Sequence, residues 1–351
     1  MEPIKVGIIG YGGSAVTYHL PFIAPNPELD IHAFLQRREA PKGSGVAQSV
    51  HCTIDFPDSK HYRTSEAFFA DDKIELVVIC TNVDMHAELT ERALRAGKHV
   101  VVEKPFTMSS KEADDLIALS KLAGKILTVN LVENGTLGEI TEFESRYDMD
   151  DLRALIWDKP VPGDGMLYVL GGHTIDQALQ LFGLPASVTA WTRSLRKDCK
   201  VDDAFTVTLQ YAGEKKDLVC TLKTTVVSCG PANKQLRFHV RGTKGTFMKQ
   251  IEHLMGGLRP GTATFGVEPR DFHGFLSTRV MSKSVPENAS TSFDRTFESL
   301  PGSYYDYYED VARAIRGERD VAVKPEESRN VIRVIELAKQ SADKGITIPW
   351  S

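Results

Sequence analysis

Two residues of this chain are placed to move protons. Lys104 stands in Glu103-Lys104-Pro105, at the end of an apolar run that begins at Lys98. A lysine delivered by a strand to the rim of a sheet can hydrogen-bond or deprotonate a substrate hydroxyl. The second residue, His173, is expected at the start of a helix, where an imidazole can act as acid or base. The alternatives are an ion pair of Lys104 with its neighbour Glu103 or with Asp114 or Asp115, and a packed core histidine for His173.

A glycine-rich turn precedes Lys104 by about ninety residues. The segment from Gly10 to Ala15 reads G-Y-G-G-S-A, follows a predicted strand and opens a predicted helix. Glycines let the backbone approach a pyrophosphate, and the N–H groups of a helix start bind it. This context favours a dinucleotide site at Gly10, Gly12, Gly13 and Ser14 over a plain tight turn.

The residues after the second predicted strand bear on the choice of cofactor. An NAD site usually has an acidic residue there, which binds the ribose 2′-hydroxyl. This chain has Arg37 and Arg38 instead. Guanidinium groups suit a 2′-phosphate, so the sequence favours NADP, with NAD as the alternative. The competing interpretation is a solvated loop in which Glu39 pairs with either arginine.

The first part of the chain alternates predicted strands and helices. One predicted helix begins at a capping box formed by Ser109 and Glu112 and ends at Gly124. The rhythm predicts a doubly wound parallel sheet, the Rossmann type of α/β fold, with Thr81 and Asn82 at the carboxyl edge where ligands bind. The strands are expected at 5–9, 30–35, 75–80, 98–103 and 125–130, and the helices at 14–24 (broken at Pro21), 65–69, 85–96 and 109–123.

After about Asn130 the pattern changes to β-branched and alternating segments. These predict a C-terminal α+β domain with an open, mainly antiparallel sheet. Its strands are expected at 139–147, 187–193, 204–211, 217–227 and 235–241, with a single helix among them at 172–181, a surface loop at 277–300 and closing helices at 304–316 and 326–342. The expected domains are a dinucleotide-binding domain at 1–128 and a substrate and oligomerisation domain at 129–351.

Composition excludes several classes of protein. The 351 residues carry a net charge of −5, which argues against nucleic acid as a partner. There is no long apolar stretch or leader pattern, so we expect neither a membrane span nor secretion. The five cysteines are scattered, without a C-x-x-C pair. They predict no disulfide framework and no metal site, and a cytoplasmic location.

The motifs together resemble the Gfo/Idh/MocA oxidoreductases over nearly the whole chain. The likeness rests on the glycine turn with Tyr18-His19-Leu20-Pro21, on Thr81-Asn82 with His86, on 97–105 (GKHVVVEKP), 135–140 (GTLGEI), 172–176 (GHTID) and 241–245 (RGTKG), and on 307–310 (YYED) and 314–317 (AIRG). The resemblance implies NAD(P)-dependent oxidation or reduction at a hydroxyl-bearing carbon of a sugar, cyclitol or dihydrodiol. It also implies a homo-oligomer, either a dimer or a tetramer.

The resemblance assigns roles to residues. Lys104 and His173 become the catalytic pair, and Asp176 and Tyr168 border the substrate. Cofactor-binding positions are Gly10, Gly12, Gly13, Ser14, Arg37, Arg38, Thr81, Asn82, His86 and Glu103. From the residues alone, His86 is more readily a helix-start residue than a catalyst.

Two departures from the family pattern stand out. Val169 occupies the position, four residues before His173, where the family normally has an aspartate. Asp164 and Asp176 are the candidates to replace it. The segment between Asn130 and Gly135 is also too short for the helix usually found there, so the second domain is shortened. The prediction is therefore an NADP(H)-dependent oxidoreductase, with a catalytically impaired NAD(P)-binding regulatory protein as the alternative.

Overall fold

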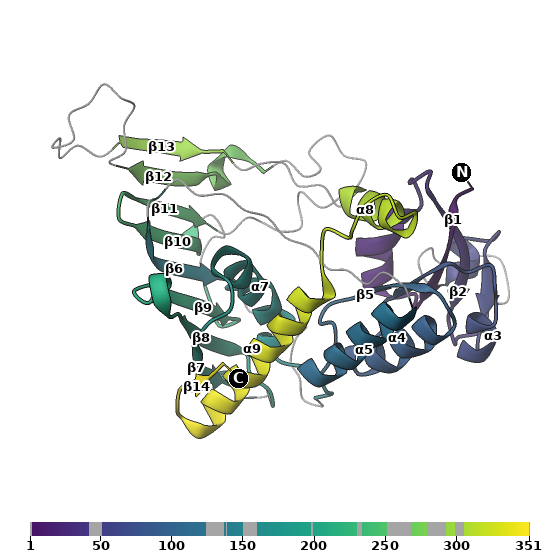
Figure 1. The fold of residues 1–351 in the computed structure, drawn as a ribbon, viewed down its shortest axis with the longest axis horizontal. Coiled ribbons are helices and arrows are strands. Elements are labelled where there is room, and N and C mark those ends of the chain that lie inside the picture. Colours follow the sequence, from purple (N-terminus) through teal and green to yellow (C-terminus); the bar gives the residue numbers. More distant parts are fainter. Residues whose placement is uncertain are drawn as a thin grey trace. The chain divides into compact units, whose positions relative to one another are not determined.

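The computed structural model divides the chain into two compact units (Figure 1). The first comprises Met1–Asn130 and Ser303–Ile332, and the second Leu131–Gly302 and Arg333–Ser351. The helix after Ser303, which sequence analysis groups with the second domain, thus belongs to the first unit. The structure describes residues 2–41, 51–123, 137, 139–149, 160–197, 199–229, 234–250, 268–278, 293–298 and 305–350.

The first unit contains a five-stranded parallel sheet of order β3-β2-β1-β4-β5. Its strands are β1 (Ile4–Ile9), β2 (Leu29–Leu35), β3 (Lys60–Tyr62), β4 (Leu76–Ile79) and β5 (His99–Val102). All four residues of β4 are buried, as expected for a parallel strand covered on both faces. The Rossmann-type sheet predicted from the alternating pattern is confirmed.

Helices cover this sheet and connect its strands. One apolar core joins the sheet to α3 (Ser65–Phe69), α4 (His86–Arg95) and α5 (Ser110–Ala123). The predicted capping box is present, because Ser109 Oγ accepts from Glu112 N–H and Glu112 Oε2 accepts from Ser109 N–H. The remaining helices of the unit are η1 (Ala15–His19), α1 (Leu20–Ile23), α2 (Cys52–Asp55), η2 (Val83–Met85) and α8 (Tyr305–Ile315).

The helix predicted after the glycine turn differs from expectation. Residues Ala15–His19 form a π-helical turn, and α1 begins only at Leu20. Pro21 therefore lies in the first turn of α1, where its missing N–H costs nothing, instead of breaking a longer helix. The predicted strand at 125–130 lies outside the described residues. Among the helices that the structure describes, none is long and apolar enough to cross a membrane.

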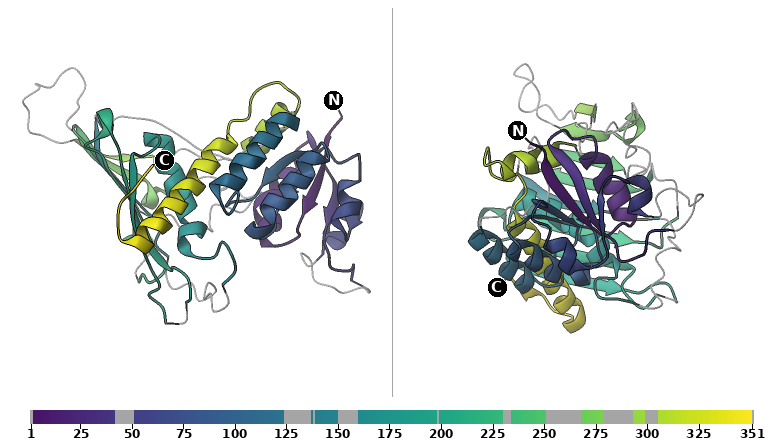
Figure 2. Two further views of the ribbon diagram at one scale, coloured as in Figure 1. Left: turned by 60° about the horizontal axis from the view of Figure 1, so that its bottom comes forward. Right: turned by 90° about the vertical axis from the view of Figure 1, so that its right-hand side faces the viewer.

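The second unit is built on a nine-stranded sheet of order β13-β12-β11-β10-β6-β9-β8-β7-β14. These strands are labelled in Figure 1, and Figure 2 shows the ribbon from two further directions. Its neighbouring strands are antiparallel except for the parallel pair β6 and β9. The strands are β6 (Ile140–Arg146), β7 (Ser187–Arg193), β8 (Ala204–Gln210), β9 (Val219–Thr225), β10 (Leu236–Gly242), β11 (Gly245–Gln250), β12 (Gly274–Thr278), β13 (Phe293–Phe297) and β14 (Ile348–Pro349).

Helix α7 (Gly171–Phe182) packs on one face of this sheet, where Phe182 contacts Phe143 of β6 at a ring-centroid distance of 5.2 Å. The helix α9 (Pro325–Lys344) runs from the first unit into the second. Within the second unit its Ser341 Oγ accepts from the Ala190 N–H of β7 at 2.9 Å. Both contacts anchor helices to the side of the sheet that carries the apolar core.

Two expectations for this unit are wrong. A second helix, α6 (Met166–Val169), precedes α7, so α7 is not the single helix among the strands. The segment 277–300 is not one loop, because β12 ends in it and β13 lies within it. The strand β13 reads Phe-Asp-Arg-Thr-Phe, and its two charged residues hide it from an apolar pattern. Its backbone pairs with β12 and so forms a strand that the composition does not indicate.

Candidate functional site

The glycine turn after β1 has one glycine that the fold itself requires. Gly10 has φ +92°, and a Cβ there would lie 2.5 Å from the Cys80 carbonyl oxygen. At Gly12 and Gly13 an added Cβ would meet no protein atom within 4 Å, and both residues are exposed. Packing within the protein does not explain these two glycines. Their open surroundings fit the close approach of a pyrophosphate to the backbone.

Cations gather where β2 ends at the same edge of the sheet. Arg37 and Arg38 are exposed, and neither guanidinium group has an ion-pair partner among the described residues. Glu39, the alternative partner for them, pairs instead with Arg63 Nη1 at 2.9 Å. Arg63 Nε also donates to the Arg37 carbonyl at 3.2 Å. The geometry thus leaves two guanidinium groups available for an anionic ligand.

The predicted cofactor positions after β4 include a buried clamp. The His86 ring lies between two carbonyl oxygens, with Nδ1 2.8 Å from that of Pro105 and Nε2 3.1 Å from that of Thr81. His86 is 1% exposed and begins α4, as expected for a helix-start residue. Asn82, in contrast, is exposed. His86 therefore joins the loops after β4 and β5.

Glu103, immediately before Lys104, is the centre of a hydrogen-bond network. Its Oε1 accepts from Ser14 Oγ at 2.5 Å and lies 3.0 Å from His19 Nε2, while Oε2 accepts from Lys104 N–H at 2.8 Å. The Tyr308 hydroxyl of α8 bonds to the other ring nitrogen of His19. Both oxygens of Glu103 are used inside the protein. The network ties the glycine turn to the loop that carries Lys104.

Electrostatics agrees with a charged Glu103 carboxylate. Burial alone would raise its pKa, but the hydrogen bonds from His19, Ser14 and the Lys104 amide outweigh burial and lower the pKa to about 2. The negative charge is therefore permanent near neutral pH. It holds the backbone on both sides of the site in place.

Lys104 is exposed at the end of this loop. The carboxylates that compete for it at the sequence level are occupied elsewhere. Asp114 forms two hydrogen bonds with Arg329, at 2.8 and 2.9 Å, and Asp115 pairs with Lys111 at 2.6 Å. Glu103 uses its oxygens for Ser14, His19 and the Lys104 N–H, and the Lys104 amine forms no ion pair with any described residue. The amine is left at the carboxyl edge of the sheet, on the loop held by Glu103.

His173 lies in the first turn of α7 and is exposed. The ring of Tyr147 is stacked on it, with centroids 6.2 Å apart and planes inclined by 24°. Val169 is the last residue of α6, and Leu170 joins the two helices. The Val169 side chain cannot orient an imidazole through a hydrogen bond, and the stacked Tyr147 ring is one neighbour that restricts the His173 ring.

A buried arginine behind Tyr147 was not found by sequence analysis. The Arg237 guanidinium carbon lies 5.0 Å from the Tyr147 ring centroid, and the residue is 9% exposed. Burial lowers its pKa to about 10, which leaves it charged near neutral pH. In the sequence Arg237 stands within a predicted strand, and no motif distinguishes it from the other arginines of the chain.

The other predicted residues of the second unit have different surroundings. Asp176 is half-buried on α7, one turn after His173. Tyr168 is 5% exposed, and Lys339 Nζ lies 4.2 Å from its ring centroid. Asp164, one candidate to replace the aspartate, accepts from Val161 N–H at 2.7 Å. Of the two candidates to replace the aspartate, Asp176 lies on α7 with His173 and Asp164 does not.

Asp202 braces the short helix that ends at Val169. Its Oδ2 accepts from the Leu167 N–H at 2.7 Å, and burial raises its pKa to about 6. A Cβ at Gly165 would lie 2.4 Å from Asp202 Oδ1, and Gly165 has φ +105°. The positive φ and the close Asp202 oxygen each explain why residue 165, immediately before α6, is a glycine.

One group of residues has the composition of a metal site. His51, Cys52 and His61 have potential ligand atoms within 4.8 Å of one another. However, His51 Nδ1 caps α2 through the Thr53 N–H, and its Nε2 lies 3.2 Å from the Arg38 carbonyl oxygen. Burial also raises the pKa of the Cys52 thiol to about 11, which disfavours the thiolate that a metal requires. These side chains brace the loop after β2.

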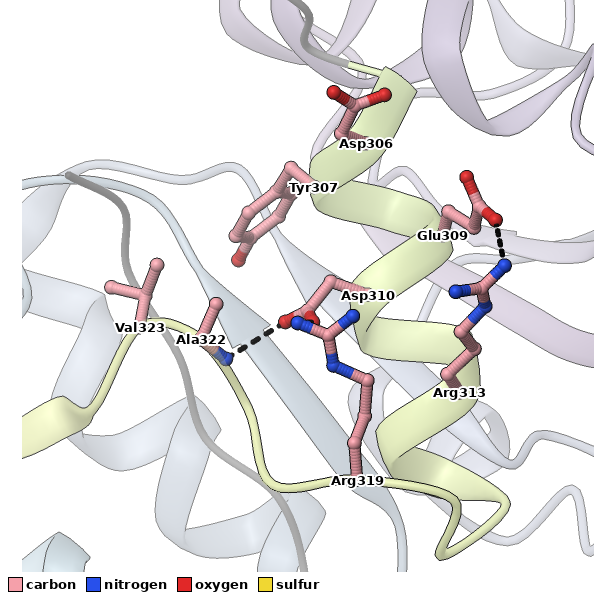
Figure 3. A pocket seen from close by; sticks show the side chains of 8 residues that line it. All are labelled: Asp306, Tyr307, Glu309, Asp310, Arg313, Arg319, Ala322 and Val323. Carbon is pink, nitrogen blue, oxygen red and sulfur yellow. Dashed lines mark hydrogen bonds and ion pairs between the residues drawn. The ribbon is translucent and has the colours of Figure 1, made fainter. Parts of the chain in front are cut away.

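A cavity of about 310 Å³ beside α8 contains none of the predicted site residues (Figure 3). Four of its charged groups form two pairs: Glu309 with Arg313, and Asp310 with Arg319. Asp310 Oδ2 also accepts from the Ala322 N–H at 2.9 Å. The paired charges and the backbone contact indicate a structural role in fixing the segment after α8.

Comparisons with known proteins cover the whole chain. A model of the oxidoreductase family's NAD-binding Rossmann fold matches residues 4–131, and one of its C-terminal alpha/beta domain matches residues 129–349. An uncharacterized oxidoreductase of Schizosaccharomyces pombe is 34% identical over 99% of this chain and 100% of its own. The scyllo-inositol 2-dehydrogenase (NADP(+)) of Bacillus subtilis is 31% identical, over 99% of this chain and 96% of its own. The structure of the oxidoreductase YvaA of Bacillus subtilis superimposes with a TM-score of 0.86 and 30% identity, over 100% of this chain and 99% of the other.

Proposed function

Since the chain belongs to the Gfo/Idh/MocA family of NAD(P)-dependent oxidoreductases, we propose that it acts on sugars, polyols, dihydrodiols or related small molecules with NADP(H) as the preferred cofactor. The observation that carries this proposal is the position of Lys104. It is exposed at the carboxyl edge of the parallel sheet, beside the loop held by Glu103. Ligands of doubly wound sheets bind at this edge.

The preference for NADP(H) is supported by the residues after β2. A 2′-phosphate needs cationic donors, and Arg37 and Arg38 supply two guanidinium groups without competing carboxylates among the described residues. The Bacillus subtilis inositol dehydrogenase, similar over nearly the whole chain, is named for NADP(+). NAD(H) is the alternative cofactor.

The residues have distinct roles in the proposed reaction. When bound, the nicotinamide supplies or accepts the hydride at C4. Lys104 donates a hydrogen bond to the reacting oxygen of the substrate and stabilises the negative charge that develops there. His173 donates the proton to that oxygen during reduction and takes it back during oxidation. Asp176 borders the substrate on the same helix.

Exposed apolar residues on the second unit support a homo-oligomer. Along the strands, Trp191, Val219 and Phe275 alternate with buried residues and are 55%, 53% and 39% exposed. They therefore lie on the face of the nine-stranded sheet opposite the apolar core. We propose that these apolar side chains are exposed because the face is buried between copies of the chain. Sedimentation tests this: wild-type protein should form an oligomer, and Trp191→Lys should weaken it.

The decisive experiment measures turnover and cofactor binding on the same preparation. NADPH and NADH oxidation are followed with a panel of ketoses and inososes, and NADP(+) reduction with the corresponding polyols. Lys104→Ala should abolish turnover and leave NADPH affinity within a few-fold, because Lys104 contacts the reacting oxygen and not the pyrophosphate. Lys111→Ala, an exposed lysine paired with Asp115, is the control and should behave as wild type.

The alternative function is that of an NAD(P)-binding regulator. The observation that favours it is Val169, which removes one usual partner of His173. A protein that binds NADPH tightly but turns over no member of the panel would support this alternative and contradict the enzymatic proposal. Wild-type activity in Lys104→Ala would instead remove Lys104 from the mechanism.

A further inference from the structure

Arg237 is a buried cation that has no carboxylate partner within the described part of the chain. Its hydrogen bonds go to neutral acceptors: Nη1 donates to Ser145 Oγ at 2.7 Å and to the Arg146 carbonyl at 2.9 Å, and Nη2 donates to Gln177 Oε1 at 2.9 Å. No carboxylate of the described residues pairs with it. Burying an unpaired charge is costly, so a guanidinium in this position requires an explanation beyond filling space.

The backbone of β10 is distorted at this arginine. The register against β11 shifts between Leu236 and Phe238. Val240 and Phe238 pair with Phe143 and Ser145 of β6, on the side that packs against α7. Regular alternation would turn Arg237 to the opposite face. The irregularity instead lets its guanidinium reach Ser145, which is the re-aiming effect that bulges have near functional sites.

The guanidinium lies against the aromatic ring that contacts His173. One face of Tyr147 is within cation–π distance of Arg237, and the ring is stacked on the imidazole. The backbone of Tyr147 is fixed as well, because its N–H donates to the Lys223 carbonyl of β9 at 3.0 Å. Arg237 also binds Gln177, one helical turn after His173 on α7. Arg237 therefore contacts both the aromatic ring stacked on the imidazole and the helix that carries His173.

We propose that Arg237 is a positioning residue for His173: it holds the Tyr147 ring against the imidazole and ties α7 to β6 at the same point. This inference rests on the proposed function, in which His173 transfers a proton to or from the substrate. In this chain position 169 offers no hydrogen bond to the imidazole. The stacked phenol ring then limits its rotation, and proton transfer requires that orientation.

The competing explanation is that Arg237 only fills the core between β6, β10 and α7. Loss of stability cannot separate the two explanations, because removing a buried guanidinium destabilises the protein in either case. The orientation of His173 separates them. A proton beside the face of a stacked aromatic ring resonates upfield, so the His173 Hε1 signal reports directly whether Tyr147 is in place.

The experiment compares Arg237→Lys, Arg237→Gln and Tyr147→Leu by NMR of histidine-labelled full-length protein, with the signal assigned by its loss in His173→Gln. Tyr147→Leu should move the His173 signal downfield. Arg237→Gln should move it in the same direction, and Arg237→Lys, which keeps the charge, should restore part of the shift. Arg241→Gln, on the same strand in an exposed ion pair with Glu142, should leave it unchanged.

Kinetics gives the second measurement. Arg237→Gln should lower kcat by roughly ten-fold or more with a much smaller change in KM, because orientation is lost and substrate contacts are not. In the Tyr147→Leu background Arg237→Gln should add little. A folded Arg237→Gln protein with the wild-type His173 signal would overturn the proposal, whether or not the protein turns over any substrate. The NMR result is therefore independent of the proposed function.

Discussion

His86 and Pro105 are joined by a hydrogen bond that sets the position of the Lys104 loop. The Nδ1 atom of His86 lies 2.8 Å from the Pro105 carbonyl oxygen, one residue beyond Lys104. The other ring nitrogen is 3.1 Å from the Thr81 carbonyl oxygen. A single buried ring thus fixes the loops that follow β4 and β5, both at the carboxyl edge of the sheet.

We predict that His86→Asn loosens both loops. The shorter side chain cannot reach both carbonyls, and each buried acceptor left unpaired costs about 1–3 kcal/mol. Thermal unfolding should show the lower stability, and kcat for NADPH oxidation should fall more than NADPH affinity. His32→Asn, which removes the 2.9 Å contact with Asp71, is the control. Equal losses of kcat in the two variants would show that the clamp has no specific effect on Lys104.

Glu103 predicts how stability depends on pH. Its pKa is about 2 in the folded protein and about 4.3 in an unfolded chain. The folded state therefore binds fewer protons, and the stabilisation, on the order of 3 kcal/mol, is present above the unfolded pKa and is lost as pH falls towards 2. Urea unfolding of wild-type protein should show this loss between about pH 5 and pH 2.

The matched variants for this prediction are Glu103→Gln and Glu309→Gln. Glutamine at 103 does not titrate, so the free energy of unfolding should be lower near neutral pH and should fall less steeply in acid. Glu309 is half-exposed and pairs with Arg313, so its replacement should keep the wild-type slope. Parallel slopes for Glu103→Gln and wild type would contradict the assigned carboxylate network.

Cofactor preference should follow Arg37 and Arg38. Arg37→Asp with Arg38→Ala removes two cations and adds a carboxylate that suits a ribose 2′-hydroxyl. NADPH affinity, measured by calorimetry, should fall by tenfold or more, since each charge-assisted hydrogen bond is worth about 1.5–3 kcal/mol. NADH affinity should change much less. Equal or stronger binding of NADH by wild-type protein would reject the NADP assignment.

Strands β1, β2, β4 and β5 of the N-terminal sheet were predictable because their signals are local, whereas the three-residue β3 was missed. Each signal that predicts an element lies within a few residues: the apolar run at 75–80, the glycine turn and the Ser109/Glu112 capping box. The π-helical turn at 15–19 was not predictable. Its last residue, His19, contacts Glu103 and Tyr308, which are 84 and 289 residues away in the sequence and cannot be paired with it from local pattern.

The candidate site could be proposed from the sequence only where a motif surrounds the residue. Lys104 and His173 stand in recognisable segments, and the structure places both at exposed element ends. Arg237 and Tyr147 have no such context, because their role depends on strand pairing and on an irregularity in β10. The role of Glu103 was predicted as cofactor binding. That role stays a prediction, and both oxygens also bond to protein groups, contacts that spacing in the sequence cannot reveal.

Val169 gives the last prediction. It ends α6 four residues before His173, with Leu170 joining the two helices, and we expect a longer side chain there to reach the imidazole across this turn. An aspartate at 169 would offer the hydrogen bond that valine cannot and would favour the charged imidazole. The limb of the pH–rate profile that reports His173 should then move to higher pH, because the proton is held more strongly.

The effect on rate separates a working enzyme from an impaired one. If Tyr147 and Arg237 already orient His173, Val169→Asp should shift the pH profile and change kcat by only a few-fold. If the imidazole is poorly oriented in wild-type protein, kcat should rise by tenfold or more on simple polyols. Val169→Asn, which supplies a hydrogen bond without charge, should raise kcat without the pH shift. Identical profiles for Val169→Asp and wild type would mean that His173 is not the titrating group, and its role as proton donor and acceptor would be withdrawn.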